Sequence, residues 1–458
     1  MQVAIFGAGY VGLVTGAVLA ELGHQVTLVE VDADKREAIR AGKPPIYEAG
    51  LDTLLPRVVG QGRLTVTEDG PEAVRQADVI FIAVGTPPLP SGDADLTYVR
   101  AASQAIGAGI DSRRRRVVVN KATVPIGSAN LVEVWITDSY REREGTMPES
   151  DWFAVASNPE FLREGTAIYD TLYPDRLVLG ADVPWAVEML RHLYAPIIAQ
   201  DFSPPPECPR PRGQGPVPVV ESDRISAEMI KYAANAFLAT KISFANEMAA
   251  ICERVGADVV QVMAGIGLDS RIGPRFLNAG AGWGGSCFGK DLAALMYTAH
   301  EYGYAPKILA ATVEVNRDQR RLIVQRVQEA LKTIKGRRVA VWGLSFKPGT
   351  DDLRDAPAIT VIRELLRLGA RVAAYDPIAM DNCARQHPEL EVQYGPDALA
   401  VLEGAEALVI MTEWEHFRDI PLEAIRARLA QPHVIDGRNL LDPDQARAAG
   451  LHYRGIGR

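Results

Sequence analysis

The feature that most constrains this chain is a glycine-rich turn placed directly after its first apolar strand. Gly7-Ala8-Gly9-Tyr10-Val11-Gly12 follows the strand expected at 3–6 and opens a helical stretch that runs to Leu22. In such a turn the first glycine permits a tight bend and the second lets the backbone approach a pyrophosphate. The third glycine lets the helix pack closely on the strand. A second strand, 26–29, ends at Glu30 about 20 residues further on, so the pattern predicts a dinucleotide site.

The residues around this turn also indicate which dinucleotide is bound. The carboxylate of Glu30 can accept hydrogen bonds from both ribose hydroxyls of an adenosine and would repel a 2′-phosphate. It therefore favours NAD over NADP, although the positive charge of the nearby Lys35 would offset part of this preference. Thr86 and Thr123 follow the next two strands and are further cofactor candidates, or else hydroxyls that cap a helix. The turn itself contributes Gly7, Gly9, Tyr10, Val11 and Gly12, unless it is a glycine turn without a ligand.

Strand-like apolar segments alternate with longer helical stretches in the first part of the chain, and the pattern returns from about Lys335 onward. Such alternation is typical of βαβ units on a parallel sheet. The sequence therefore predicts an α/β fold with two Rossmann-like doubly wound domains joined by a long central helix. The expected strands are 3–6, 25–30, 79–84, 117–120, 153–157, 338–344, 371–375, 407–412 and 433–436.

The central helix is predicted from a stretch that contains neither glycine nor proline. This stretch runs from Ser222 to Val255, with Ser222 or Asp223 as its N-cap and Gly256 as a left-handed residue after its end. Such a helix would be roughly 50 Å long, which is more than one globular domain needs. It either bridges two domains or, in addition, forms a homodimer interface along its apolar face. A linker is expected around 315–335.

Composition and charge exclude several kinds of protein. With 458 residues, 47% of them hydrophobic, the chain can form two or three packed domains. It shows neither a leader peptide nor an apolar run of the roughly 18 residues that span a membrane. The formal net charge of -9 argues against nucleic acid as a partner. We therefore expect a cytoplasmic protein whose partners include neither a membrane nor nucleic acid.

Three further sequence features are the spacing of the cysteines, a run of arginines and a proline-rich stretch. The cysteines lie far apart and form no metal-binding or disulfide pattern, so no metal is expected. Arg113–Arg116 is interpreted as a solvated loop, or alternatively as a patch for an anion or a partner. Pro204–Pro218 is interpreted as a surface loop in which Cys208 is inert. The four cysteines are Cys208, Cys252, Cys287 and Cys383.

Cys287 differs from the other cysteines because glycines surround it in Gly282-Trp283-Gly284-Gly285-Ser286-Cys287-Phe288-Gly289-Lys290-Asp291. Glycines at this density allow the backbone to pass close to a ligand. A helix is expected at 291–302, and both its N-terminus and Lys290 would favour the thiolate. Beside a dinucleotide site, a thiolate can add to an aldehyde and carry it to the acid as a thioester. The alternative is a buried, inert cysteine.

Two polar residues of the central helix could stabilise the negative oxygen formed in this chemistry. Lys231 and Asn235 are four residues apart and therefore share one face of the helix. The alternative is a lysine that extends along the apolar surface with its amine in water, together with an ordinary surface amide.

Together these motifs resemble the UDP-glucose/GDP-mannose dehydrogenase family over almost the whole chain. The matching segments are 7–12, 83–87, 157–165, 231–238, 284–291, 346–348 and 436–438. The resemblance implies NAD-dependent, four-electron oxidation of UDP-glucose to UDP-glucuronate by a homodimer. It also implies an NAD-binding domain at 1–200, a central helical dimerisation domain at 219–320 and a UDP-sugar-binding domain at 321–458.

The resemblance assigns roles residue by residue. Cys287 would carry a thiohemiacetal and then a thioester, with Lys231 and Asn235 stabilising the oxyanions. Asp291 would orient water and Lys231, and Glu160 would be the base for hydrolysis, with Thr123 positioning its water. Additional cofactor contacts would come from Glu164, Lys290 and Arg354. Substrate would be bound by Glu160, Phe161, Leu162, Arg163, Glu164, Lys231, Asn235, Arg271 (across the dimer), Phe276, Leu277, Asn278, Ala279, Gly280, Gly284, Lys347 and Arg438.

Three other functions stay open at this point. The same chemistry could act on UDP-N-acetylmannosamine, UDP-N-acetylglucosamine or GDP-mannose, although Phe288 after the cysteine favours UDP-glucose. A two-electron hydroxyacid dehydrogenase of the 6-phosphogluconate type would have no use for Cys287 or for a second α/β domain. A non-catalytic NAD-binding sensor would not need Cys287, Lys231 and Glu160 together.

Overall fold

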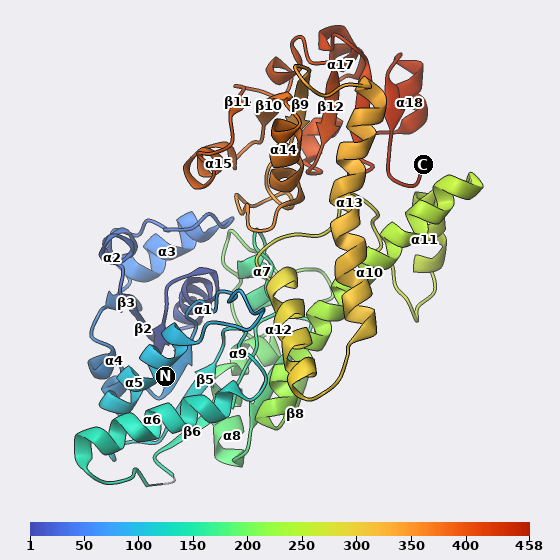
Figure 1. Cartoon of the computed structure of the whole chain (residues 1–458). Coiled ribbons are helices and arrows are strands. Elements are labelled where there is room, and N and C mark those ends of the chain that lie inside the picture. The colour runs from blue at the N-terminus through green and yellow to red at the C-terminus, as the bar shows by residue number, and fades with distance from the viewer. Residues whose placement is uncertain (150) are drawn as a thin grey trace. The chain divides into compact units, whose positions relative to one another are not determined.

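In the computed structural model the chain is described at residues 1–149 and 151–458, and it divides into two compact units. The first unit comprises Met1–Ala233 with Ala293–Thr298, and the second comprises Ala234–Leu292 with Ala299–Arg458. Each unit contains one largely parallel sheet with helices on both faces (Figure 1). The predicted fold class, two Rossmann-like α/β domains with a long central helix, is confirmed.

The sheet of the first unit has the strand order β3-β2-β1-β4-β5-β6-β7-β8. All its strand pairs are parallel except β6 with β7. Its first six strands have the doubly wound order in which ligands bind beyond the carboxyl ends of the strands. The strands are β1 Gln2–Phe6, β2 Gln25–Val29, β3 Leu64–Thr67, β4 Val79–Ile82, β5 Arg116–Asn120, β6 Phe153–Ser157, β7 Leu177–Ala181 and β8 Val219–Ser222.

Alternate side chains of β1 explain why this sheet carries helices on both faces. Val3 and Ile5 belong to a core formed with α1, α3 and α8, whereas Ala4 and Phe6 belong to a core formed with α4, α5 and α6. Successive strand residues point to opposite faces, so a continuously apolar strand needs cover on both. The helices are α1 Tyr10–Glu21, α2 Ala33–Arg40, α3 Leu51–Gly60, α4 Gly70–Gln76, α5 Thr97–Gly109, α6 Ser128–Glu144, α7 Ala167–Leu172, α8 Pro184–Leu193 and α9 Ala195–Ala199.

The second unit repeats this design in the order β11-β10-β9-β12-β13-β14. In β9, Val339 and Val341 face one core, while Ala340 and Trp342 face the other. The strands are β9 Arg338–Trp342, β10 Arg371–Tyr375, β11 Val392–Tyr394, β12 Ala407–Ile410, β13 His433–Asp436 and β14 His452–Arg454. The helices that follow β9 are α14 Pro357–Arg367, α15 Met380–Gln386, the 3₁₀ turn η1 Ala400–Leu402, α16 Glu415–Arg418, α17 Leu422–Arg428 and α18 Pro443–Ala448.

Four helices connect the two sheets along the chain. They are α10 Arg224–Val255, α11 Val259–Gly267, α12 Phe288–Glu301 and α13 Lys307–Leu331 (Figure 1). The predicted central helix is α10, whose first turn is capped by Asp223 through the N–H of Ser226 at 2.8 Å. Gly256 follows its end with φ +77°, as the left-handed residue that stops a helix. Ser222, the alternative cap, belongs to β8 instead.

The expectation of a linker around 315–335 was wrong, because α13 continues as a helix to Leu331. Buried residues such as Ile323 and Val327 recur along this helix at four-residue spacing and pack on the second sheet. The residues at 315–335 are mostly polar and charged, which is why a linker was expected there. Burial of the apolar face stabilises a helix there instead.

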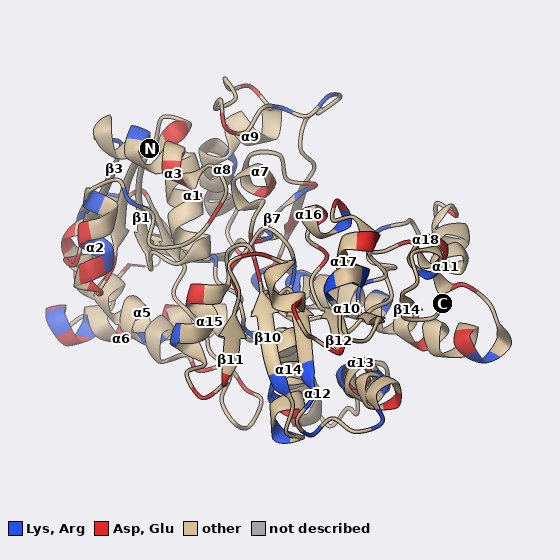
Figure 2. Cartoon of the chain, turned by 90° about the horizontal axis from the view of Figure 1, so that it is seen from above, with Lys and Arg blue, Asp and Glu red and all other residues tan. Residues whose placement is uncertain are grey.

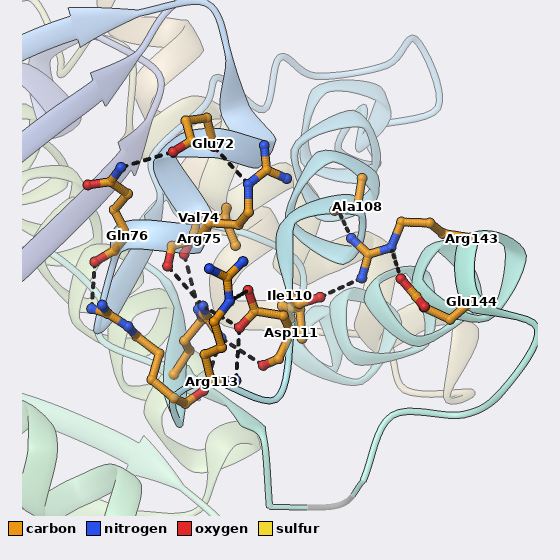
Figure 3. Close-up of polar contacts among 12 residues, drawn as sticks. Glu72, Val74, Arg75, Gln76, Ala108, Ile110, Asp111, Arg113, Arg143 and Glu144 are labelled. Carbon is orange, nitrogen blue, oxygen red and sulfur yellow. Dashed lines mark hydrogen bonds and ion pairs between the residues drawn. The ribbon is translucent and has the colours of Figure 1, made fainter.

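The interpretation of Arg113–Arg116 as a solvated loop was wrong for Arg116. Arg116 is the first residue of β5, and its side chain is 0% exposed, whereas the side chain of Arg113 is 74% exposed. The Arg116 guanidinium donates to the carbonyls of Val74 and Arg75 and to the Asp111 carboxylate at 3.0–3.1 Å. Figure 3 shows Asp111 and Arg113 within this network of carbonyls and carboxylates. The buried charge is tolerated because its donors are satisfied.

The Pro204–Pro218 segment has the irregular backbone expected of a loop, but Cys208 within it is buried. Burial raises the pKa of the Cys208 thiol to about 11, in keeping with the inert role expected for it. Among the described residues, no helix is long and apolar enough to cross a membrane.

Candidate active site

The glycine turn between β1 and α1 has the geometry of a pyrophosphate cradle. Gly7 has φ +95°, and a Cβ on Gly12 would lie 1.9 Å from the Gly7 carbonyl oxygen. These two positions therefore exclude any side chain. At Gly9, the N-cap of α1, the position of a Cβ has no described heavy atom within 4 Å. Space in front of a helix N-terminus, where backbone N–H groups point outward, fits the phosphates of a dinucleotide.

Glu30 is held beside this turn at the end of β2. Its carboxylate accepts hydrogen bonds from the backbone N–H groups of Ala8 and Asp32, both at 3.0 Å. Lys35 lies in the first turn of α2, a helix that carries both basic and acidic residues (Figure 2). Tyr10 donates from its hydroxyl to the carbonyl of Tyr47 at 2.6 Å, and Val11 packs against the core. The structure thus brings Glu30 and the glycine turn together.

The loops after β4 and β5 meet at the carboxyl edge of the same sheet. The Thr86 hydroxyl donates to the Thr123 carbonyl at 2.8 Å, so the two predicted threonines are neighbours. Thr123 also lines a small pocket together with Asn120, Glu228 and Lys231. This is the edge at which doubly wound sheets bind their ligands.

Glu160 and Lys231 form a buried ion pair in the first unit. Lys231 Nζ lies 2.9 Å from Glu160 Oε1, and the two side chains are only 5% and 7% exposed. The backbone N–H of Leu162 donates to the other carboxylate oxygen at 2.8 Å. Glu160 therefore has one oxygen fixed by a cation and one by the backbone, an arrangement that holds a base in a defined orientation.

The residues after Glu160 differ in their surroundings. The ring of Phe161 lies under the guanidinium of Arg176 at 3.7 Å and within 5.3 Å of Lys231 Nζ. Leu162 packs against the core. Arg163 is exposed and its guanidinium binds Asp170, while Glu164 is half-buried. The Phe161 ring, predicted to bind substrate, therefore lies beside Lys231.

In the second unit, Cys287 stands directly before α12. Its carbonyl accepts the N–H of Asp291 at 2.9 Å, so the cysteine occupies the N-cap position of this helix, which begins at Phe288 and not at the expected residue 291.

The glycines before Cys287 are required by packing. A Cβ on Gly284 would lie 2.4 Å from the Asp355 carbonyl oxygen, and one on Gly285 would lie 2.8 Å from the Phe346 ring. The loop after β9 therefore fixes the path of the cysteine loop.

Asp291 links two further predicted residues in the second unit. Its carboxylate accepts from Asn235 Nδ2 at 2.6 Å and from Lys290 Nζ at 2.6 Å, and its side chain is 1% exposed. Lys290 was expected to favour the Cys287 thiolate, yet its amine pairs with Asp291. Asn235 lies one turn beyond Lys231 along α10, so a single helix positions both groups.

Substrate-binding candidates of the second unit gather around the same loops. Arg438 donates to the carbonyls of Met411 at 2.7 Å and Gly282 at 3.2 Å, which ties β13 to the cysteine loop. Gly280 packs on the carbonyl of Gly437 so closely that a Cβ on Gly280 would lie 2.7 Å from the Gly437 carbonyl oxygen. The Lys347 amine lies 5.5 Å from the ring of Phe346. The structure thereby joins Gly280, Gly284, Lys347 and Arg438.

The loop at 276–280 contains a strained position and mixed exposure. Phe276 has φ +64°, which is rare for a residue with a side chain and costs of order 1 kcal/mol or more. Its ring meets Phe288 edge-on at 6.5 Å. Leu277 and Ala279 are buried, whereas Asn278 is exposed and available to a ligand.

Two further predicted arginines form ion pairs with nearby aspartates. The Arg271 side chain is 86% exposed and pairs with Asp269. The Arg354 guanidinium pairs with Asp352, although its carbonyl accepts the N–H of Gly285 at 2.9 Å.

Sequence reasoning missed two buried ionisable groups near the predicted site. Glu228 lies three residues before Lys231 on α10, and burial raises its pKa to about 7, with its hydrogen-bond donors acting in the opposite direction. Lys121 donates to Asn158 Oδ1 at 2.9 Å, and burial lowers its pKa to about 8 while Glu160 acts to raise it. The sequence feature that could have identified Glu228 is its spacing of three residues from Lys231, which places both residues on one face of the helix.

The doubly wound sheets, the glycine turn and the cysteine at the start of a helix together define a dehydrogenase of the Rossmann-fold class. Comparison with known proteins identifies the family. Models of the UDP-glucose/GDP-mannose dehydrogenase family match 1–198 as its NAD binding domain, 225–318 as its central domain and 340–443 as its UDP binding domain. The chain belongs to this family, it is an oxidoreductase, and its cofactor is NAD.

Several relatives match over nearly their whole length. UDP-glucose 6-dehydrogenase TuaD of Bacillus subtilis is 45% identical over 457 residues, which cover 100% of this chain and 93% of TuaD. The UDP-glucose 6-dehydrogenase of Pseudomonas aeruginosa is 44% identical, with 100% and 98% covered. The structure of a UDP-glucose dehydrogenase from Pyrobaculum islandicum, 39% identical, superposes with a TM-score of 0.88 over 99% of this chain and 97% of that one.

Two alanine substitutions in the glycine turn should separate folding from cofactor binding. Gly12→Ala must displace the Gly7 backbone, so we expect a lower melting temperature together with loss of NAD binding. Gly9→Ala has room for its methyl group within the protein and should melt close to the wild type. It should nevertheless bind NAD about tenfold or more weakly, because the methyl group occupies the space for the pyrophosphate. Calorimetric titration with NAD would check this, and wild-type affinity in Gly9→Ala would contradict the assignment.

Proposed function

We propose that this chain oxidises UDP-glucose to UDP-glucuronate in two steps through a thioester on Cys287. The observation that carries the proposal is the placement of Cys287 at the N-cap of α12, in a loop whose glycines leave no room for side chains against the loop after β9. The curated relatives named above act on UDP-glucose, and their similarity extends over the full chain. The same chemistry on another nucleotide sugar is the alternative.

The first oxidation removes a hydride from C6 of the sugar and a proton from its hydroxyl group, which passes to water, so that the alcohol becomes an aldehyde. NAD⁺, when bound, accepts one hydride in each of the two oxidations. The Cys287 thiolate then forms a C–S bond to the aldehyde carbon, and the carbonyl oxygen takes up the electron pair. Lys231 and Asn235, from successive turns of α10, provide the cationic and amide donors that stabilise this oxyanion. Loss of the second hydride turns the thiohemiacetal into a thioester.

Hydrolysis of the thioester releases the acid. Water forms a C–O bond to the thioester carbon, its proton passes to the Glu160 carboxylate, and the C–S bond breaks to return Cys287 as a thiolate. Glu160 suits this role because the Leu162 N–H and Lys231 hold its two oxygens. Thr123 is assigned to position the water, and Asp291 to orient Lys231 and water.

The remaining predicted residues are assigned to binding. The NAD-binding domain at 1–200 supplies the glycine turn, with Glu30, Lys35, Thr86 and Thr123, and Glu164, Lys290 and Arg354 also contact NAD. The UDP-sugar-binding domain at 321–458 supplies Lys347 and Arg438, while the central domain at 219–320 supplies Gly284. The other substrate residues are Phe161, Leu162, Arg163, Arg271, Phe276, Leu277, Asn278, Ala279 and Gly280. We place the enzyme in the cytoplasm, where its nucleotide substrates occur.

The stoichiometry of the reaction distinguishes this mechanism from simple alcohol oxidation. The wild type should form two NADH for each UDP-glucose consumed, measured by absorbance against the amount of UDP-glucuronate produced. Cys287→Ser should lose this four-electron turnover and stop at a covalent or aldehyde stage. Cys208→Ser, at a buried cysteine without an assigned role, is the matched control and should behave as the wild type.

One NADH per sugar, or an unaffected Cys287→Ser variant, would contradict the thioester mechanism. Two NADH from a different nucleotide sugar, without turnover of UDP-glucose, would retain the mechanism and replace the substrate.

We also propose that the enzyme is a homodimer that pairs along α10. An apolar stripe of Phe237, Phe244, Ile251 and Val255 lies along one face of this helix, and these side chains are 66%, 44%, 48% and 71% exposed. Their spacing of seven, seven and four residues follows the helical repeat. Exposed apolar stripes of this kind mark contact surfaces. Arg271, itself exposed, would reach the substrate of the partner subunit.

Mixed dimers test whether Arg271 acts across the interface. Arg271→Ala and Cys287→Ser should each be inactive alone. Dimers that combine the two variants contain one site with both a cysteine and the partner's arginine. Random mixing should therefore restore about a quarter of the wild-type activity per chain, measured as NADH formation after co-expression. If mixed dimers form but stay inactive, Arg271 does not act across the dimer.

A further inference from the structure

Glu228 is a buried carboxylate that caps a helix from a distant part of the chain. It lies on α10 and is 4% exposed, and its oxygens accept from the N–H of Gly127 at 2.6 Å and of Ala129 at 3.1 Å. The N-cap of α6 is Gly127, which has no side chain to accept from the first N–H groups of the helix. Glu228 replaces that cap, and its negative charge suits a helix N-terminus.

The loop between Thr123 and Gly127 is therefore fixed at both ends. At its beginning the Thr123 carbonyl accepts from the Thr86 hydroxyl at 2.8 Å, and at its end the Gly127 N–H donates to Glu228. Glu228 also accepts from the Ser157 hydroxyl at 3.3 Å, which ties it to the end of β6, three residues before Glu160. One carboxylate thus connects the loop that carries Thr123 with the strand that leads to Glu160.

Glu228 also lines the small pocket formed with Thr123, Lys231 and Asn120. Its volume of about 10 Å³ is close to the space that one water molecule needs. The Asn120 side chain is 2% exposed, and neither its amide nitrogen nor its oxygen has a hydrogen-bond partner among the described residues. Buried amides are almost always paired, either with protein or with ordered water.

We propose that Glu228 is a positioning residue for thioester hydrolysis: with Asn120 it fixes a water molecule beside Lys231 and holds the Thr123 loop in place. This inference rests on the proposed function, because Thr123, Glu160 and Lys231 matter to hydrolysis only if a thioester forms. It adds two residues to the site, neither of which touches the reacting carbon. Glu228 requires its carboxylate because it accepts from two backbone N–H groups at once.

Glu228→Gln retains the size of the side chain but replaces one acceptor oxygen with an NH₂ group that faces a backbone N–H. Two donors that face each other cannot bond, so the Thr123 loop should lose its position. We expect kcat to fall about tenfold and the KM for UDP-glucose to fall with it, because slower hydrolysis lets the covalent intermediate accumulate. Because the loss falls on hydrolysis, stopped-flow mixing should show a rapid burst of two NADH per site before slow turnover. Glu142→Gln, at an exposed position of α6, is the matched control and should show wild-type kinetics.

Asn120→Ala is the second variant, because its side chain makes no hydrogen bond to the described protein and its loss should not prevent folding. It should show the same burst and a smaller fall in kcat. Unchanged kcat in both variants, or slow turnover without a burst, would overturn the proposal. Failure of the proposed function is a separate result, since the wild type would then not form two NADH per UDP-glucose.

Discussion

The buried ion pair between Lys231 and Glu160 is the interaction on which the rest of the proposed site depends. Removing two such charges from water costs several kcal/mol for each ion, and the pairing only offsets this cost. Apolar residues of similar size would stabilise the fold at least as well, so the pair is better explained by chemistry than by stability. Loss of either partner would remove the opposite charge that offsets the burial of the other.

Helix α10 carries the lysine of this pair together with two other functional groups, which follow one another along the helix. Glu228 caps α6, Lys231 binds Glu160, and Asn235 binds Asp291 one turn later. A helix fixes the spacing of these groups without relying on loops. In the second unit, the loops after β9 and β13 impose the path of the cysteine loop through contacts with Gly280, Gly284 and Gly285. The glycines there reflect close packing rather than flexibility.

The sequence predicted the elements that carry strong patterns. The two sheets, α10 and the helix start at Cys287 follow from apolar strands, the absence of helix breakers and glycine spacing. Strands β3, β8, β11 and β14 escaped prediction because they are short and lie at sheet edges, where burial is incomplete and the pattern weak. Strand β7, which is buried, also escaped prediction. The antiparallel pairing of β7 with β6 is set by tertiary packing and has no local signal.

Charged residues inside the fold were the harder part of the prediction. Arg116 stands in a run of four arginines, and its hydrogen bonds to the carbonyls of Val74 and Arg75 and to the Asp111 carboxylate explain why this one is buried. The pairing of Lys290 with Asp291 could not be derived from their adjacency. For Glu228 the pattern showed only that it shares a face with Lys231. Its partners, Gly127 and Ala129, lie about a hundred residues away in the chain.

The most direct test of the account is intact-protein mass spectrometry of Glu160→Gln mixed with UDP-glucose and NAD⁺. Without the base that activates water, hydrolysis should stall after both oxidations. The account predicts that the protein gains the mass of a UDP-glucuronyl group, that peptide mapping places it on Cys287, and that two NADH form per site. Continued turnover without an adduct, or an adduct at another residue, would contradict the role of Cys287 as the covalent carrier.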